Sequence, residues 1–275
     1  MSIKDLVFHL DTSDTGQRVT DFAISLAQST GAHLTAAGLA VQYLGPGGLE
    51  DAGGYEALME LTEQSRKATE LAYQNLLAQA PAGLQTDFVL IEALAAIARD
   101  RFGALARHFD LSIVGQGSGE AADEDGLMVE GALLGSGRPV FVVPAKHQGG
   151  VQLEKAMVCW NGSAVAARAL AGALPLLKRA SVVEVVDIMR ADDPLEELPG
   201  FNITRHLARH GINATLRRLP NARSVSAALL SHASDSGADY LVMGGYGHWR
   251  LREFVFGGTT RSILSSMTVP VLMAH

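Results

Sequence analysis

The sequence predicts an α/β protein built from two doubly wound domains, each with a five-stranded parallel sheet. Three observations lead to this fold class. Short apolar, β-rich runs alternate with helical stretches, the same order of elements occurs twice along the 275 residues, and a polar, glycine-containing segment at residues 144–154 separates the two copies. We therefore expect domains at residues 1–146 and 152–275, related by a pseudo-twofold axis.

The repeat consists of three pairs of segments that share order and character. The matching segments are residues 5–14 with 155–164, 109–119 with 238–248, and 136–145 with 267–275. The first pair, DLVFHLDTSD and KAMVCWNGSA, places Asp11 opposite Asn161 and Ser13 opposite Ser163. A repeat of this kind indicates two copies of one structural unit.

Strands and helices are expected to alternate within each copy. In the second copy, strands are expected at residues 156–160, 182–188, 214–219, 240–243 and 271–274, and helices at 163–177, 194–210, 224–234 and 259–266. Alternation of this kind is typical of right-handed βαβ units, whose parallel sheet is covered on both faces and whose strands are therefore nearly all apolar. The first copy has an additional Gly-rich loop at residues 44–54, followed by a long amphipathic helix. We interpret that loop as a variable surface connection.

Composition narrows the function classes. A hydrophobic fraction of 48% and a charged fraction of 19% are typical of a globular protein with a sizeable core. A net charge of −7 disfavours general binding of nucleic acid, and no apolar run approaches the roughly 20 residues that cross a bilayer. The single cysteine, Cys159, excludes an intramolecular disulfide and is interpreted as a buried strand residue. Since the start of the sequence shows no basic leader, we expect a cytoplasmic protein with no membrane or nucleic-acid partner.

A binding site is expected at one edge of each sheet, because doubly wound sheets bind ligands beyond the carboxyl ends of their strands, where strand order reverses. In the first copy this edge contains residues 11–13 and 115–119. The candidates at the corresponding edge of the second copy are Asn161, Gly162, Ser163, Asp187, Gly244 and Gly247.

A glycine pattern in the second copy resembles a known motif. Two residues separate Gly244 from Gly247, and nine more separate Gly247 from Gly257. This spacing resembles the Gly-2x-Gly-9x-Gly-(Ser/Thr) nucleotide motif of the universal stress protein family, and the strand and helix order of both copies is similar to that family over nearly the whole chain. The resemblance implies a tandem universal stress protein with a Rossmann-like, adenine nucleotide alpha hydrolase-like fold. Gly258 stands where the family usually has Ser or Thr, which implies that one hydroxyl contact is missing.

The chemistry of this motif fits a phosphate site. Glycines permit positive φ and let backbone amides approach a ribose or phosphate, and the helix that Gly258 opens offers free N–H groups and the positive end of its dipole. Thr259 and Thr260 can cap this helix and donate hydroxyls. His248 and Arg250, between the glycine clusters, can face the phosphates. The alternatives are tight turns with a helix cap for the glycines, and solvated loop charges for His248 and Arg250.

The two copies divide the features of such a site between them. In nucleotide-binding members of the family, an Asp after the first strand contacts the nucleotide; Asp11 keeps this residue type, whereas the second copy has Asn161. The glycine pattern of the first copy is degenerate, and Asp123, Glu124 and Asp125 bring negative charge that would repel a phosphate. We therefore expect nucleotide in the second copy only. Asp11 stays a weaker candidate, whose alternative role is to cap the following helix.

No catalytic residues or metal ligands are predicted. We interpret the histidines, without ligand spacing, as surface or core residues, among them His9, His33, His206, His210 and His232. The expected function is that of a stress-response regulator that binds ATP or AMP, with or without Mg²⁺, and acts through an unidentified protein partner. One alternative is an interaction scaffold without a cofactor, if Asn161 and Gly258 abolish the site. A less favoured alternative is a weak nucleotide hydrolase, with at most slow ATP hydrolysis.

The last strands of the two copies are expected to pair. VFVV and VLMA are strongly apolar, and free edges of this composition favour aggregation. Members of the resembled family commonly pair the fifth strand antiparallel across a dimer, and a tandem chain can make this pairing internally. We therefore expect residues 140–143 to pair with 271–274, so that one chain imitates a dimer, and we leave a homodimer of whole chains open.

Overall fold

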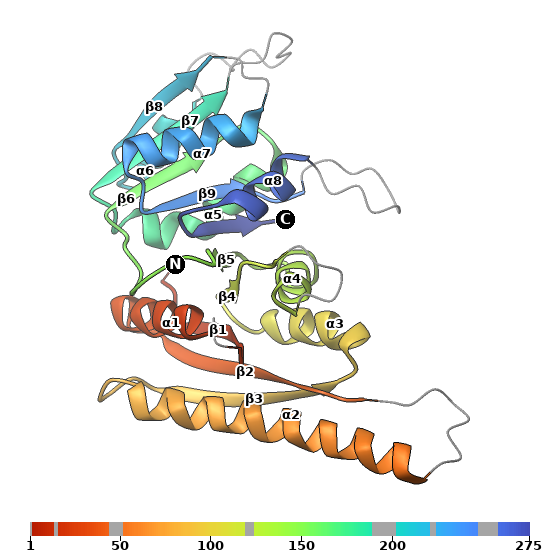
Figure 1. Ribbon diagram of the computed structural model, residues 1–275. Helices are drawn as coiled ribbons and strands as arrows, with labels where there is room; N and C mark the ends of the chain where they lie inside the picture. Colours follow the sequence, from red (N-terminus) through yellow and green to blue (C-terminus); the bar gives the residue numbers. More distant parts are fainter. Residues whose placement is uncertain are drawn as a thin grey trace. The chain divides into compact units, whose positions relative to one another are not determined.

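The computed structural model describes residues 2–13, 16–43, 52–118, 124–188, 202–220, 224–246 and 258–275, and the structural statements below concern these residues. The chain divides into two compact units, Ser2–Val151 and Gln152–His275. In each unit, helices pack against a parallel sheet (Figure 1). The predicted α/β class is therefore correct.

The N-terminal unit has five described strands whose order reverses between β1 and β4. Its elements are β1 (Asp5–Leu10), α1 (Gln17–Thr30), β2 (His33–Val41), α2 (Ala52–Gln79), β3 (Thr86–Ala93), α3 (Ala95–Ala106), β4 (Leu111–Gly115), α4 (Glu124–Glu130), the π-helical turn η1 (Gly131–Gly135) and β5 (Val140–Val143). The strands pair in parallel in the order β3-β2-β1-β4-β5. The chain continues from β1 to β2 on one side and adds β4 on the other, which places the topological switch point between β1 and β4.

The C-terminal unit repeats this arrangement. Its elements are β6 (Lys155–Cys159), α5 (Ala164–Leu177), β7 (Val182–Ile188), α6 (Ile203–Arg209), β8 (Ala214–Leu219), α7 (Val225–Ser236), β9 (Tyr240–Gly244), α8 (Gly258–Ser266) and β10 (Val271–Ala274). The parallel order is β10-β9-β6-β7-β8, with the switch point between β6 and β9. The predicted strands of this copy agree with the observed ones to within one residue. Of the predicted helix at 194–210, residues 194–201 lie outside the described residues.

The core of each unit lies on both faces of its sheet. Phe8, Ile113 and Phe141 are fully buried in the N-terminal unit, as are Leu241 and Leu272 in the C-terminal one. Every residue of β4, β5 and β10 is buried without interruption. Because successive residues of a strand point to opposite faces, this burial shows that both faces are covered, which explains why these strands lack polar alternation.

The internal repeat extends to individual hydrogen bonds. Asp110, just before β4, accepts a hydrogen bond at Oδ2 from the backbone N–H of Asp5 at 3.1 Å. Asp239, just before β9, accepts one at Oδ2 from the backbone N–H of Lys155 at 2.7 Å. Asp5 and Lys155 are opposite each other in the sequence alignment of the two copies, so the same residue type ties the same pair of strands in both units.

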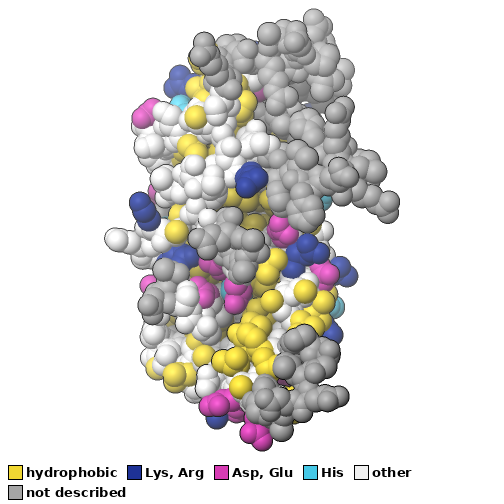
Figure 2. All heavy atoms as spheres, turned by 45° about the vertical axis from the view of Figure 1, so that its right-hand side comes forward, with side chains coloured by type: hydrophobic (Ala, Val, Ile, Leu, Met, Phe, Trp, Pro, Cys, Tyr) yellow, Lys and Arg dark blue, Asp and Glu magenta, His cyan; other side chains and the backbone are white. Residues whose placement is uncertain are grey.

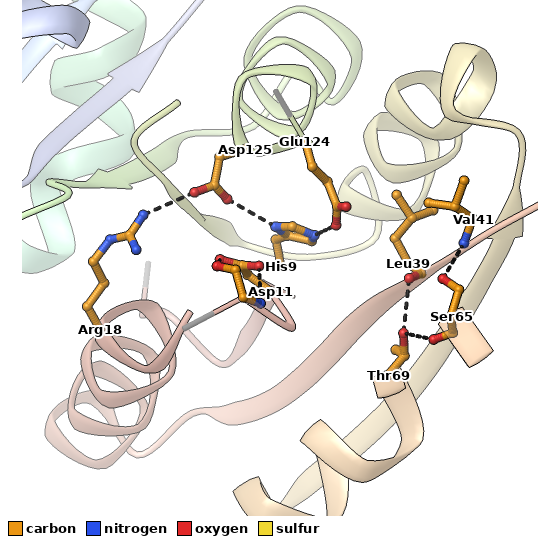
Figure 3. Close-up of polar contacts among 10 residues, drawn as sticks. His9, Asp11, Arg18, Leu39, Val41, Ser65, Thr69, Glu124 and Asp125 are labelled. Atoms are coloured by element: carbon orange, nitrogen blue, oxygen red, sulfur yellow. Dashed lines mark hydrogen bonds and ion pairs between the residues drawn. The ribbon is translucent and has the colours of Figure 1, made fainter. Parts of the chain in front are cut away.

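Helix α2 is fixed to β2 by hydroxyl groups rather than by apolar contacts alone (Figure 3). Ser65 Oγ accepts a hydrogen bond from the backbone N–H of Val41 at 2.9 Å, and Thr69 Oγ1 donates one to the carbonyl of Leu39 at 3.0 Å. A Cβ at Gly38 would overlap the Thr69 methyl group, so glycine lets the helix approach the strand. These contacts set the position of the long helix that distinguishes the first copy.

Hydrophobic side chains are also found on the surface of the N-terminal unit, and Figure 2 shows them gathered on one face of it. Tyr55, Met59 and Leu71 of α2 are the most exposed large hydrophobic residues described there. Some exposed apolar side chains are common on protein surfaces, and they assign no function by themselves. Within the described part of the chain, no helix combines the length and the hydropathy that crossing a bilayer requires.

Candidate functional site

The predicted residues of the second copy gather at one edge of the C-terminal sheet. Asn161 follows β6, Asp187 is the last residue but one of β7, and Gly244 ends β9. The three strands are parallel, and Cys159 is level with Val186 and with Met243 in their registers. The carboxyl ends of neighbouring parallel strands therefore bring these residues to the same edge, at the switch point.

The turn after β6 is shaped by its own side chains. Asn161 Oδ1 accepts a hydrogen bond from the backbone N–H of Ser163 at 3.1 Å, and Gly162 has a φ of 71° that favours glycine. Ser163 is the N-cap of α5, and its Oγ accepts from the backbone N–H of Ala166 at 3.2 Å. The turn thus directs the N-terminus of α5 to the edge of the sheet.

Gly244 does not have the positive φ that we expected. We expected it to permit a positive φ and the approach of a ligand, but its φ is not positive, and a Cβ there would lie 2.7 Å from the backbone nitrogen of Ala166 and 2.6 Å from Val165 Cγ2. Glycine is needed at this position because the first turn of α5 packs directly against the end of β9. In the described part of this loop, a positive φ occurs at Tyr246, where it is 53°.

The loop after β9 is bonded to two neighbouring elements of its unit. The backbone N–H of Gly245 donates to the carbonyl of Ala274 at the end of β10, at 2.9 Å. The backbone N–H of Tyr246 donates to Thr260 Oγ1 in the first turn of α8, at 3.1 Å. Sequence reasoning assigned Thr260 to capping or ligand binding and did not foresee this bond. Because of it, the N-terminus of α8 is held beside the end of β9.

The start of α8 agrees with the prediction in position. The helix begins at Gly258, one residue before the expected start. A Cβ at Gly258 would meet no described atom within 4 Å, and Thr259 is exposed, whereas Thr260 is buried. Four predicted site residues, Gly247, His248, Arg250 and Gly257, lie outside the described residues, so their roles stay predictions.

The cysteine and the histidines described in this unit provide neither a reactive thiol nor a metal site. Desolvation raises the pKa of Cys159 to about 12, so its thiol stays protonated and is a poor nucleophile or metal ligand at neutral pH. His206 and His210, interpreted above as lacking ligand spacing, are in fact four residues apart, and their ring centroids are 4.8 Å apart. The described residues nevertheless contain no group of three or more His, Cys, Asp or Glu side chains that could hold a metal ion.

The corresponding turn of the N-terminal unit follows β1. Asp11 Oδ1 accepts a hydrogen bond from the backbone N–H of Ser13 at 2.8 Å, as Asn161 does from Ser163. Helix α1 as described begins at Gln17, and its N-cap, Gly16, makes no side-chain cap hydrogen bond. Residues 14 and 15 lie outside the described residues, so the alternative role of Asp11 as a cap of the helix expected near Thr15 stays a prediction. In the described residues, Asp11 stabilises its own turn through Ser13.

Beyond this turn, charged side chains of the N-terminal unit contact one another around His9 (Figure 3). His9 Nε2 contacts Glu124 Oε1 at 2.8 Å, and His9 Nδ1 contacts Asp125 Oδ1 at 3.3 Å. Arg18 Nη2 donates to Asp125 Oδ2 at 3.0 Å. The side chains of His9, Arg18 and Asp125 are 1%, 8% and 11% exposed, so most of the network is shielded from water.

The imidazole of His9 carries a proton in this network. Burial alone would lower its pKa, but the hydrogen bonds and charges of Asp125 and Glu124 outweigh burial and raise the pKa to about 9. Both ring nitrogens then donate, one to Asp125 and one to Glu124. We expected Glu124 and Asp125 to repel a phosphate with free negative charge. The structure differs in one respect, because Glu124 pairs with His9 and Asp125 pairs with both His9 and Arg18, so their negative charge is compensated.

Comparisons with known proteins agree with this fold. Residues 153–275 match the sequence profile of the Universal stress protein family. The universal stress protein Slr1230 of Synechocystis sp. is 24% identical over 301 residues, which cover 98% of this chain and 99% of the relative.

Two solved structures are similar to the chain over nearly its whole length. One is a universal stress protein from Archaeoglobus fulgidus DSM 4304, with a TM-score of 0.70, 17% identity and coverage of 98% of this chain and 97% of that chain. The other is the functionally unknown protein PA1789 from Pseudomonas aeruginosa PAO1, with a TM-score of 0.57, 13% identity and coverage of 99% and 92%. At such identities the structural likeness establishes the fold alone.

Proposed function

Residues 153–275 match the Universal stress protein family, and from this similarity we propose that the C-terminal unit binds an adenine nucleotide, ATP or AMP, at the carboxyl ends of β6 and β9. In this proposal the bound nucleotide changes which protein partner the chain engages. The chain is then a stress-response regulator rather than an enzyme.

The observation that carries the proposal is the convergence of two helix N-termini on the end of β9. Helix α5 meets it at Gly244, against the backbone of Ala166, and α8 meets it through the hydrogen bond between Tyr246 and Thr260. The first N–H groups of a helix have no partner within that helix, and its dipole is positive at this end. Two such ends at a switch point favour a phosphate group, and the glycine spacing of residues 244–257 supports the same ligand.

A second candidate, a scaffold that binds no nucleotide, is favoured by one observation. The backbone N–H groups of Gly245 and Tyr246 already donate to Ala274 and Thr260, and Asn161 Oδ1 already accepts from Ser163. Backbone amides for a phosphate would therefore have to come from the first turns of α5 and α8 or from residues 247–257. This requirement makes direct measurement of binding the deciding experiment.

Thermal unfolding with a panel of ligands separates the two candidates. A ligand that binds only the folded protein raises the melting temperature, by an amount that grows with its concentration relative to Kd. We expect ATP or AMP to raise it, and expect adenosine, which lacks a phosphate, to have a smaller effect. If adenine nucleotides leave the melting temperature unchanged at millimolar concentration, the scaffold is the better account.

A further inference from the structure

Two cationic side chains of the N-terminal unit lie where a doubly wound fold binds anions. His9 is the last residue but one of β1, beside the switch point, and Arg18 lies in the first turn of α1. The positive end of the α1 dipole is at this turn. Both cations are almost fully buried, at 1% and 8% exposure of their side chains. Buried cations in such a place require a bound anion, because an uncompensated buried charge is strongly destabilising.

The anion present is supplied by a distant part of the same chain. Asp125 spans the two cations, with one carboxylate oxygen on His9 and the other on Arg18, and Glu124 contacts the second ring nitrogen of His9. These oxygens receive the same charge-assisted hydrogen bonds that the oxygens of a phosphate would receive. We propose that His9 and Arg18 form a phosphate-binding site and that Asp125 and Glu124 occupy it as an intramolecular ligand.

The end of β4 is shaped to receive this internal ligand. A Cβ at Gly115 would overlap Asp125 Oδ2 and lie 2.6 Å from Asp125 Cγ, so any other residue there would displace the carboxylate. Glycine at the end of this strand therefore admits an anionic group to the edge of the sheet. In this unit the admitted group is a carboxylate of the chain itself.

The site is specific to the N-terminal unit. Cys159 is opposite His9 in the aligned copies, and a thiol with a pKa of about 12 provides no positive charge. Arg168 is opposite Arg18, but it is exposed. The inference concerns residues of the N-terminal unit alone, so it does not depend on nucleotide binding by the C-terminal unit.

The proposal predicts that the site opens when the internal carboxylates lose their charge. In the variant Glu124→Gln/Asp125→Asn, His9 and Arg18 lose the carboxylates that pair with them, and burial then lowers the pKa of His9. Inorganic phosphate can displace the neutral amides, pair with Arg18 and restore the proton on His9. The experiment uses the full-length protein at neutral pH and compares thermal unfolding in chloride with that in phosphate or sulfate at equal ionic strength. We expect phosphate to raise the melting temperature of this variant by several degrees more than that of the unchanged protein.

The matched control neutralises two carboxylates that pair with a surface arginine. Asp100 and Glu130 both contact Arg99, so Asp100→Asn/Glu130→Gln makes the same change in net charge, with Glu130 on the same helix as the internal ligand. Its response to phosphate should equal that of the unchanged protein. Adding Arg18→Gln to the Glu124→Gln/Asp125→Asn variant, called the open variant below, should remove the additional stabilisation by phosphate.

Isothermal titration with inorganic phosphate measures the same step directly. The open variant should bind one more phosphate per chain than the unchanged protein. Both proteins have the same C-terminal unit, so phosphate bound there does not contribute to the difference between them. If the double variant does not fold, Asp125→Asn alone should show the same effect at smaller size, because Glu124 still pairs with His9. Equal responses to phosphate in all variants, or an effect that persists with Arg18→Gln, would overturn the proposal.

Discussion

The backbone N–H of Tyr246 donates a hydrogen bond to the side-chain hydroxyl of Thr260 at 3.1 Å. Tyr246 has a positive φ of 53°, which is uncommon for a residue other than glycine. The bond therefore fixes an unfavourable backbone conformation and joins the end of β9 to the first turn of α8. If the C-terminal unit binds a phosphate group at this edge, Thr260 positions the helix N-terminus that faces it.

Thr260→Val tests this role with nearly the same side-chain volume. Loss of the hydroxyl leaves the Tyr246 amide without its acceptor, so we expect the free energy of unfolding to fall by about 1 kcal/mol and nucleotide affinity to fall with it. Chemical unfolding and titration with ATP measure the two effects. Thr260→Ser should restore both, and Thr259→Val, at an exposed neighbour, is the control for stability. A fully stable Thr260→Val protein would show that the bond is dispensable.

Gly115→Ala tests the close approach of Asp125 to the end of β4. The added methyl group would overlap a carboxylate that His9 and Arg18 hold in place, so we expect a loss of about 1–3 kcal/mol in the free energy of unfolding. The loss should shrink in the Asp125→Ala background, where the carboxylate is absent, and a double-mutant cycle measures this coupling. Additive effects of the two substitutions would contradict the observed contact.

Gly258→Ala is the matched glycine control for stability. Its Cβ would meet no described atom within 4 Å, and its φ is not in the positive range. We therefore expect a change within about 0.5 kcal/mol in the free energy of unfolding, measured in the same way. A large destabilisation here would mean that glycine is required at the start of α8 for a reason that the described contacts do not contain.

Stability should depend on pH through His9. The pKa of His9 is raised to about 9 in the folded protein from an ordinary value of 6.5, by the network that outweighs its burial. Below the ordinary value both states bind the proton, and the stabilisation is fully present; between 6.5 and 9 only the folded state keeps it. The contribution is therefore lost as pH rises through this range, and its total is on the order of 3 kcal/mol.

His9→Gln isolates this pH dependence. Urea unfolding at several pH values between 6 and 9.5 should show a steeper decline of stability for the unchanged protein than for the variant, because other titrating groups contribute equally to both. The variant is expected to be less stable at neutral pH, since it leaves the mostly buried carboxylate of Asp125 and the partly exposed carboxylate of Glu124 with one cation fewer. Parallel pH profiles would contradict the protonated state of His9.

Local patterns predicted the fold and part of the site. The β7 strand at Val182–Ile188 was expected with the same bounds, because an apolar run between helical stretches carries its own signal. The turn at Asn161–Ser163 was placed by residue types that accept backbone hydrogen bonds nearby. Such interactions need no knowledge of distant parts of the chain.

The interactions that were missed depend on tertiary packing. His9 and Asp125 are 116 residues apart in sequence, so their contact follows from the position of α4 and not from any local pattern. Gly244 is a second example. The motif predicted a ligand contact for this glycine, but its close packing against the first turn of α5 could be seen only in the structure. The pairing expected between residues 140–143 and 271–274 stays a prediction.

The central claim is that this chain binds one adenine nucleotide, in its C-terminal unit. Isothermal titration of the full-length protein, freed of any carried-over nucleotide, with ATP, ADP and AMP tests it most directly. The account predicts one site per chain, lost in Gly247→Val, where a side chain would block close approach of a ligand to the backbone, and unchanged in the matched variant Gly117→Val of the first copy. Two equal sites, binding that survives Gly247→Val, or no binding of any of the three nucleotides would contradict it.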